Sequence, residues 1–374
     1  MGELERFANV IEWLDKARWT YGGWWDGWNH TIVRNLSADQ KILAHWITYI
    51  TDMRMSAKLV WTQGLPVFAT IVQQYSDGAD PRNLLRDKRV EKELGKVDTL
   101  KIDEDLRFTP RYPWHYDQIQ RTLEILVDYD RSLVQLMKSV VAPYRDNQRG
   151  LRPLARALYL LTYANPNQYD TKDTREILRY TGGKLDKRFQ KWDEDTTKGG
   201  QKRLWAALRD YVKHDKLRNC VEEVFPSWLQ CVQPSDLELP GDVWNDVFAN
   251  KLLYSLAERN GVNTQGKKGR SNVNTPTLAR RIYDAVKASN PSTSFYPEQL
   301  DVSFDFASRM CDKSLCDICV FGRNEADDVC ARPGPAKLCP ILLILTGYKQ
   351  TCNIEGCPIV AGDGKGLCEG QNMC

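Results

Sequence analysis

The stretch Ser37–Met55 reads SADQKILAHWITYITDMRM, and it decides the fold class. It has a helical pattern with a clear start, because Ser37 is a favourable N-cap residue. Gln40 follows three residues later, at the position that completes a capping box with Ser37. We therefore predict a helix that begins at about Ser37 and runs through Met55.

Helical patterns continue outward from this segment in both directions. The first 18 residues after Met1 carry apolar side chains near a 3.6-residue period, and six further segments have helical character. These segments are 118–141, 151–163, 173–180, 202–212, 242–259 and 277–288. The series of short alternating strands that a sheet domain needs is missing. The sequence predicts a mainly α protein with a multi-helix body at 1–298 and a cysteine-rich metal-binding segment at 299–374.

Composition sets limits on the class of protein. Charged residues make up 27% and apolar residues 42%, and the net charge is +3, so a nucleic-acid footprint would have to be local. The N-terminus has acidic residues in its first turn and does not resemble a secretory signal. The longest apolar run, from Pro340 to Thr346, is too short to span a bilayer. We expect a cytoplasmic protein without a membrane partner.

The cysteines are concentrated at one end of the chain. Nine of the eleven lie in the last 64 residues, and the first is Cys220. Clustered thiolates in a reducing compartment usually bind metal rather than form disulfides. The predicted metal ligands are Cys311, Cys316, Cys319, Cys330, Cys339, Cys352, Cys357 and Cys368.

The spacing favours an iron–sulfur cluster over zinc. Cys311, Cys316 and Cys319 form C-x4-C-x2-C, in which two thiolates on one tight turn can bind a single centre. Structural zinc sites more often use two C-x2-C pairs, and only one such pair is present. We expect one or two clusters, most simply of the 4Fe-4S type, with zinc as the alternative.

The segment Leu300–Cys311 (LDVSFDFASRMC), followed by Cys316 and Cys319, resembles the end of iron–sulfur DNA glycosylases of the helix-hairpin-helix superfamily. In that family a last helix runs into the first cysteine, and the cluster is structural. The family's spacing, C-x6-C-x2-C-x5-C, differs from the spacing in this chain. The helical architecture also resembles that of the phage enzymes that hypermodify thymine-derived bases in DNA. Both resemblances imply DNA as the partner, as a flipped base or a single strand.

Three side chains are candidates for acid–base or electrostatic catalysis. His45 and Asp52 lie on one face of the predicted helix, together with Thr48. A substrate lying along the helix could reach both groups. Asp301 is the third candidate. Against this, most histidines in helices are structural core or surface residues.

Cations mixed with aromatic rings suggest where nucleic acid would bind. Trp24 and Trp25 belong to a tryptophan-rich segment that either stacks bases or forms a packing corner. Arg107 and Arg111 flank a proline-limited segment in which arginine could hold phosphate while rings stack on a base. The flexible basic loop at 260–276 carries three more candidates. These are Lys267, Lys268 and Arg270.

Two functions remain open at this level. The first is an enzyme that processes or modifies DNA bases, either glycosylase-like or a transferase, with a structural cluster. The second is a non-enzymatic module that binds nucleic acid or protein and is stabilised by iron–sulfur or zinc. The motifs for nucleotide hydrolysis, dinucleotide binding, and serine or zinc hydrolysis are missing.

Overall fold

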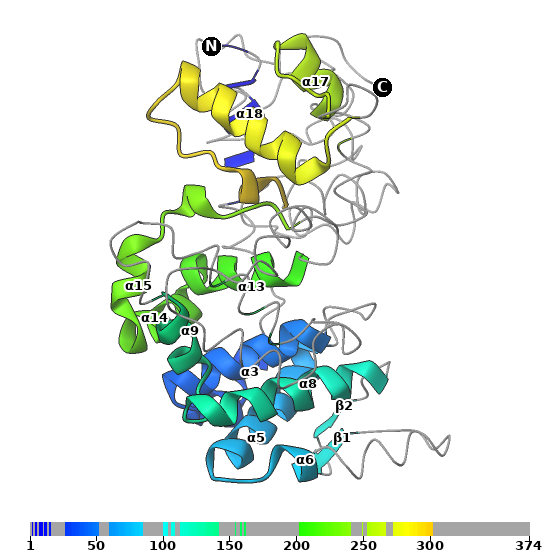
Figure 1. Ribbon diagram of the computed structural model, residues 1–374, viewed down its shortest axis with the longest axis vertical. Coiled ribbons are helices and arrows are strands. Elements are labelled where there is room, and N and C mark those ends of the chain that lie inside the picture. The colour runs from blue at the N-terminus through cyan, green and yellow to red at the C-terminus, as the bar shows by residue number, and fades with distance from the viewer. Residues whose placement is uncertain are drawn as a thin grey trace, which may run out of the picture. The chain divides into compact units, whose positions relative to one another are not determined.

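The computed structural model describes about half of the chain, and helices dominate this part (Figure 1). The described residues are 27–51, 60–84, 100–103, 106–108, 113–141, 202–240, 253–266, 272–301, single positions between 2 and 15, and residues 154, 158, 161 and 249. This confirms the prediction of a mainly α protein. No helix among these residues has the length and apolar character needed to cross a membrane.

The described residues divide into two compact units. One unit lies between residues 27 and 236. Its elements are α2 (Thr31–Asn35), α3 (Ala38–Thr51), the π-helix η2 (Val60–Gly64), α5 (Leu65–Ser76), α6 (Pro81–Leu84), β1 (Leu100–Asp103), β2 (Leu106–Phe108), α8 (Pro113–Leu126), the 3-10 turn η3 (Val127–Tyr129), α9 (Leu133–Val141), α13 (Lys202–Lys213), α14 (Asp215–Val224), α15 (Pro226–Cys231) and η5 (Pro234–Asp236).

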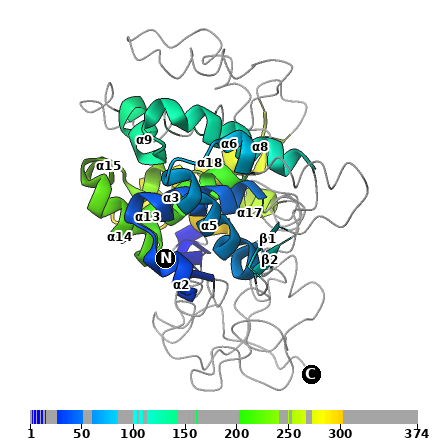
Figure 2. The same cartoon turned by 90° about the horizontal axis from the view of Figure 1, so that it is seen from below.

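The central helix of this unit is α3, which contacts α5, α8, α9 and α14 (Figure 2). Every residue from Ile42 to Thr51 is buried, so α3 is covered on all sides. A helix enclosed in this way draws its stability from packing rather than from its own propensity. Its start is the predicted capping box: Gln40 N donates to Ser37 Oγ at 3.3 Å, and Ser37 N donates to Gln40 Oε1 at 2.9 Å.

The helix predicted over 118–141 is interrupted in the structure, so that prediction was wrong. Asp130 and Arg131 have φ angles of 53° and 58°, and they separate η3 from α9. Arg131 Nη1 donates to the carbonyl oxygens of Tyr75 and Ala79, at 2.8 Å each. These two acceptors lie more than 50 residues away in the sequence, which explains why the local pattern did not reveal the break.

A glycine permits close packing between the turn at 27–29 and η2. A Cβ atom on Gly27 would lie 2.0 Å from the carbonyl oxygen of Trp61, which real Cβ atoms do not tolerate. The turn therefore requires glycine at this position. The close approach holds the neighbouring Trp28 in the core of the unit, where its side chain is buried.

One antiparallel hairpin is the only sheet in the described part of the chain. It pairs β1 with β2, with Leu100 opposite Phe108 and Lys101 opposite Arg107. The register shifts between Lys101 and Asp103. Arg107 thus lies in extended backbone.

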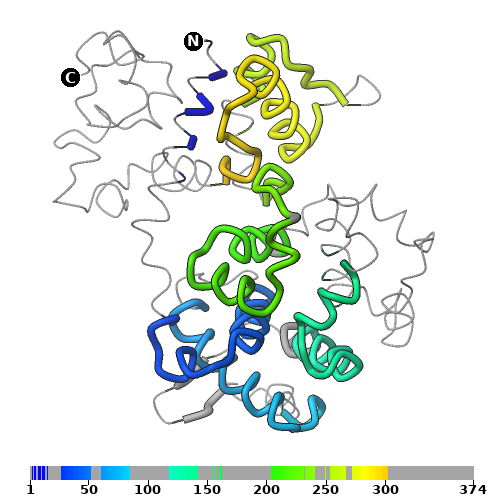
Figure 3. The backbone as a smooth tube through the Cα atoms, turned by 90° about the vertical axis from the view of Figure 1, so that its left-hand side faces the viewer, coloured from blue at the N-terminus to red at the C-terminus, as the bar shows by residue number. Residues whose placement is uncertain are grey.

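The second unit contains the described residues of 2–15 and 237–301 (Figure 3). Its elements are α17 (Tyr254–Arg259), α18 (Thr275–Ser289) and the 3-10 turn η7 (Pro297–Gln299). Gln299 Nε2 donates to Asp15 Oδ2 at 3.3 Å, which joins the two ends of the described sequence of this unit. The predicted domain border at 298/299 remains a prediction, because residues 302–374 lie outside the described residues.

Candidate functional site

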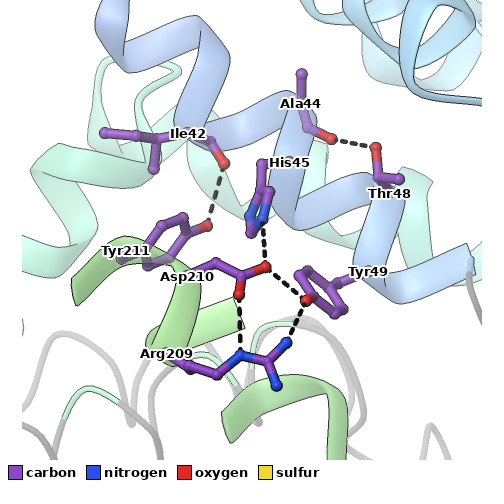
Figure 4. A network of polar contacts seen from close by, with 8 residues as sticks. All are labelled: Ile42, Ala44, His45, Thr48, Tyr49, Arg209, Asp210 and Tyr211. Atoms are coloured by element: carbon purple, nitrogen blue, oxygen red, sulfur yellow. Dashed lines mark hydrogen bonds and ion pairs between the residues drawn. The ribbon is translucent and has the colours of Figure 1, made fainter. Parts of the chain in front are cut away.

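A buried hydrogen-bond network between α3 and α13 is the most elaborate polar feature among the described residues of the first unit (Figure 4). His45 Nε2 lies 3.2 Å from Asp210 Oδ2, and both side chains have 0% exposure. The two residues are 165 positions apart in the sequence. One carboxylate therefore connects the central helix to a helix from the other half of the chain.

Both oxygens of Asp210 have further partners. Tyr49 Oη donates to Oδ2 at 2.6 Å, and Arg209 Nε donates to Oδ1 at 3.0 Å. Arg209 Nη2 also donates to Tyr49 Oη at 3.3 Å, which closes the network. Burial alone would raise the pKa of Asp210, but the Arg209 guanidinium and the hydrogen bonds from His45 and Tyr49 hold it well below its ordinary value. Asp210 is therefore ionised at neutral pH.

The imidazole of His45 is neutral in this setting. Burial lowers its pKa below the ordinary value, although the hydrogen bond to Asp210 acts in the opposite direction. An ionised carboxylate can only accept hydrogen bonds, so the proton of the neutral ring is assigned to Nε2. This is the same relation by which a carboxylate fixes the tautomer of a catalytic histidine.

Aromatic rings enclose the network and keep it dry. The centroid of the His45 ring lies 4.9 Å from that of Tyr49, 5.1 Å from Trp61 and 5.2 Å from Tyr211. Trp28 lies 6.1 Å away. Tyr211 Oη donates to the carbonyl oxygen of Ile42 at 3.1 Å, a second polar link between α13 and α3.

A second histidine lies beside the same tryptophan. The His214 ring is 6.3 Å from Trp28, and His214 forms the junction between α13 and α14. Burial lowers the pKa of His214 to about 4. Two neutral imidazoles therefore flank Trp28 at physiological pH.

The network has the chemistry of a histidine–carboxylate pair but is closed to solvent. His45, Asp210 and the surrounding rings leave no exposed surface on the imidazole. In this state the pair joins α3 to α13, and a substrate cannot reach it. Thr48, which was expected to share the catalytic face, donates its Oγ1 hydrogen to the carbonyl oxygen of Ala44 at 2.7 Å.

The structure gives His45 an acidic partner that the sequence analysis did not name. Asp52 lies outside the described residues, whereas the structure brings Asp210 to the imidazole. No local signal could have identified Asp210, because its partner precedes it by 165 residues. Asp301, the third catalytic candidate, lies in the second unit, next to η7, with 9% exposure.

Most of the other predicted site residues fall outside the described part of the chain. Arg107 lies in β2, and nothing further is described of its side chain. The residues outside are Trp24, Trp25, Arg111, Lys267, Lys268, Arg270 and the eight predicted metal ligands Cys311, Cys316, Cys319, Cys330, Cys339, Cys352, Cys357 and Cys368. Among the residues that are described, no group of three or more His, Cys, Asp or Glu side chains is arranged to hold a metal ion.

Comparisons with known proteins give no relative: no protein-family model, curated protein or solved structure matches the chain.

The network predicts a large loss of stability when Asp210 is neutralised. Asp210→Asn removes the buried negative charge to which Arg209, His45 and Tyr49 donate, and we expect the free energy of unfolding to fall by about 3–5 kcal/mol. Urea denaturation followed by circular dichroism measures this change. Glu222→Gln, on the exposed side of α14, is the matched control and should change stability by less than about 0.5 kcal/mol. Equal effects of the two substitutions would contradict the role given to the network.

The lowered pKa of His214 predicts that the protein loses stability in mild acid. Its folded-state pKa of about 4 lies below the ordinary value of 6.5, so the unfolded chain binds a proton more readily between these values. Stability should therefore fall as the pH decreases through this window, by about 1.5 kcal/mol between about pH 6.5 and about pH 5 from His214 alone. The lowered pKa of Asp210 also makes stability fall on acidification, but only below about pH 4, where the carboxyl group of the unfolded chain takes up its proton.

The measurement is the urea midpoint of wild type and His214→Gln at about pH 7 and about pH 5. The variant should show a smaller pH-dependent loss than wild type. His30→Gln is the control, since His30 lies half-buried at the N-cap of α2, outside the network. If the pH dependence of stability were unchanged in His214→Gln, His214 would not be its source.

Proposed function

We propose that this chain is a DNA base-processing or base-modifying enzyme, glycosylase-like or a hypermodifying transferase, that carries a structural iron–sulfur cluster on its C-terminal cysteines. The observation that carries the proposal is the concentration of nine cysteines in the last 64 residues, after a helical body with two cysteines. The C-x4-C-x2-C run follows the segment that resembles the end of iron–sulfur DNA glycosylases.

The donor set fits an iron–sulfur cluster. Thiolates are the usual ligands of such clusters, and eight of the C-terminal cysteines supply enough of them for one or two sites. These ligands would be Cys311, Cys316, Cys319, Cys330, Cys339, Cys352, Cys357 and Cys368. A cluster bound there would stabilise the segment around it, as structural metal sites do. Four thiolates also bind zinc, which remains the alternative metal.

The start of the cysteine segment is anchored in the helical body. Leu300 is fully buried at the end of η7, and the neighbouring Glu298 side chain is buried as well. Tyr296 and Gln299 form a capping box around this turn. The described part of the second unit therefore ends in a capped, buried turn about ten residues before Cys311.

In this proposal the catalytic and binding residues are the ones that the sequence analysis predicted. A base flipped from DNA would stack on Trp24 and Trp25 while Arg107 and Arg111 hold the phosphates. Asp52 and Asp301 would serve as base or as electrostatic stabiliser. His45 holds the fold together in the closed state of the network, so a catalytic role for His45 would require that network to open.

The metal proposal predicts a coloured protein. After anaerobic purification we expect a broad absorption band near about 400 nm and about four iron atoms per cluster. Cys316→Ser should lower the iron content and the absorption band, because it removes a thiolate of the C-x4-C-x2-C run. Cys220→Ser is the matched control, since Cys220 is a half-buried free thiol on α14. A colourless wild-type protein with stoichiometric zinc would contradict the iron–sulfur proposal.

A non-enzymatic binding module is the second candidate, and one observation favours it. The two candidate catalytic residues that the structure describes, His45 and Asp301, have 0% and 9% exposure. Side chains so deeply buried make poor acid–base groups for a macromolecular substrate. In this alternative the same metal segment stabilises an adaptor for nucleic acid or protein.

Intact-mass analysis of DNA separates the two candidates. The metal-loaded protein is incubated with oligonucleotides that contain normal, damaged and 5-hydroxymethylated bases, and their masses are measured. An enzyme removes or alters a base and changes the mass, whereas a binding module retains DNA on a gel and leaves every mass unchanged. A protein that neither binds nor alters any oligonucleotide at low salt would refute both the enzyme and the nucleic-acid-binding module.

A further inference from the structure

Four aromatic rings of the described residues surround the imidazole of His45, and three of them belong to helices. These three are Tyr49 on α3, Trp61 on η2 and Tyr211 on α13. Both tyrosines are also tied by their hydroxyl groups, which donate to Asp210 and to a carbonyl group of α3 (Figure 4). The fourth ring is that of Trp28, which lies in the short turn at 27–29.

The indole of Trp28 is buried without a hydrogen bond. Trp28 is 4% exposed, and its Nε1–H group, which is shielded from solvent, meets no acceptor in the described part of the chain. A buried donor without an acceptor loses the hydrogen bond that it would make with water. Compared with a satisfied indole, this loss favours a solvated state of the ring by about tenfold to a hundredfold. The burial of so large an apolar ring acts in the opposite direction and keeps the closed state dominant.

The turn that carries Trp28 lies at the surface of the first unit. Asn29, the next residue in the sequence, is exposed, and so is Thr31 at the start of α2. Lys216 Nζ of α14 donates to Asn29 Oδ1 at 3.1 Å, and this contact is also exposed. Trp28 therefore reaches the core from an exposed turn, whereas the other rings around His45 reach it from packed helices.

The ring of Trp28 packs against two histidines. Its centroid lies 6.1 Å from that of His45 and 6.3 Å from that of His214. His45 belongs to α3, and His214 is the N-cap residue of α14. A displacement of this one ring would therefore uncover both imidazoles together.

Gly27 sets how closely the turn approaches η2. A Cβ atom at this position would lie 2.0 Å from the carbonyl oxygen of Trp61 and 3.5 Å from Leu65 Cβ. The nearest of these atoms belongs to the backbone of a helix, so it cannot rotate aside as a side chain can. Any residue with a Cβ would have to move the turn away from η2, and Trp28 would move with it.

We propose that the turn at 27–29 is a gate over the histidine–carboxylate pair. In the closed state the indole of Trp28 covers His45 and His214. In the open state the turn moves away from η2, the indole N–H is solvated, and both imidazoles become accessible to a solute, while Asp210 still joins α13 to α3. This inference goes beyond the proposed function and does not depend on it, because it concerns access to a buried acid–base pair and not the identity of a substrate.

The test is the reaction of the imidazoles with diethyl pyrocarbonate in neutral buffer, followed residue by residue by peptide mass spectrometry of the full-length protein. The reagent attacks the lone pair of a neutral imidazole, so His45 and His214 can both react once they are accessible. The opening variant is Gly27→Ala. The matched control is Gly2→Ala, since a Cβ atom added at Gly2 meets nothing within 4 Å.

We expect Gly27→Ala to raise the modification rates of His45 and His214 together, by about tenfold or more, because the added Cβ disfavours the closed position of the turn. Gly2→Ala should react at the wild-type rates. Unchanged rates at both histidines in Gly27→Ala, or a higher rate at His214 alone, would overturn the gate.

The urea dependence of the same rates separates a gate from global unfolding. The opening of a short turn exposes little surface, so the rates in Gly27→Ala should change little over low urea concentrations. A rate that depends on global unfolding rises steeply with urea, and a steep rise in Gly27→Ala would also overturn the gate. None of these results depends on DNA, so failure of the gate leaves the proposed function standing.

Discussion

The carboxylate of Asp210 is the constraint on which the first unit depends. It is the anion to which His45, Tyr49 and Arg209 all donate, in a space closed by aromatic rings. A buried charge is tolerated only when it is fully paired, and here each oxygen has a close donor. The pairing fixes the rotation of α3, because His45 and Tyr49 lie one turn apart on the same face. The side chains of α3 that pack against α5, α8 and α9 are oriented by the same constraint.

This arrangement separates stability from function. The most elaborate polar group of the described residues is sealed inside a helical unit, where it orients helices. The features that carry the proposed function are different: the thiolates at 311–374 and the cations of the loop at 260–276. The loop at 260–276 and the buried turn η7 belong to the second unit, whose described polar contacts hold turns and helix ends in place.

Local signals in the sequence predicted local structure well. Ser37 and Gln40 gave the start of α3 through a capping box that the structure contains, and the segment 202–212 corresponds closely to α13. The break between α8 and α9 was missed, because Arg131 is held by carbonyl groups of a distant turn. Asp210 was missed for the same reason, because its hydrogen-bond partner His45 is brought to it only by tertiary packing. The cysteine prediction rests on the number and spacing of the thiols in the sequence, and all of its ligands lie outside the described residues.

The separation of 165 residues between His45 and Asp210 also affects when the first unit can fold during translation. While the ribosome is still adding residues 46 to 209, α3 has no carboxylate to receive its histidine and tyrosine, and its apolar faces lack α14. Contacts of such long range form late and slow the folding of a domain. We therefore expect the helices before α13 to complete their packing only after α13 has left the exit tunnel, and their apolar faces to be open to chaperones until then.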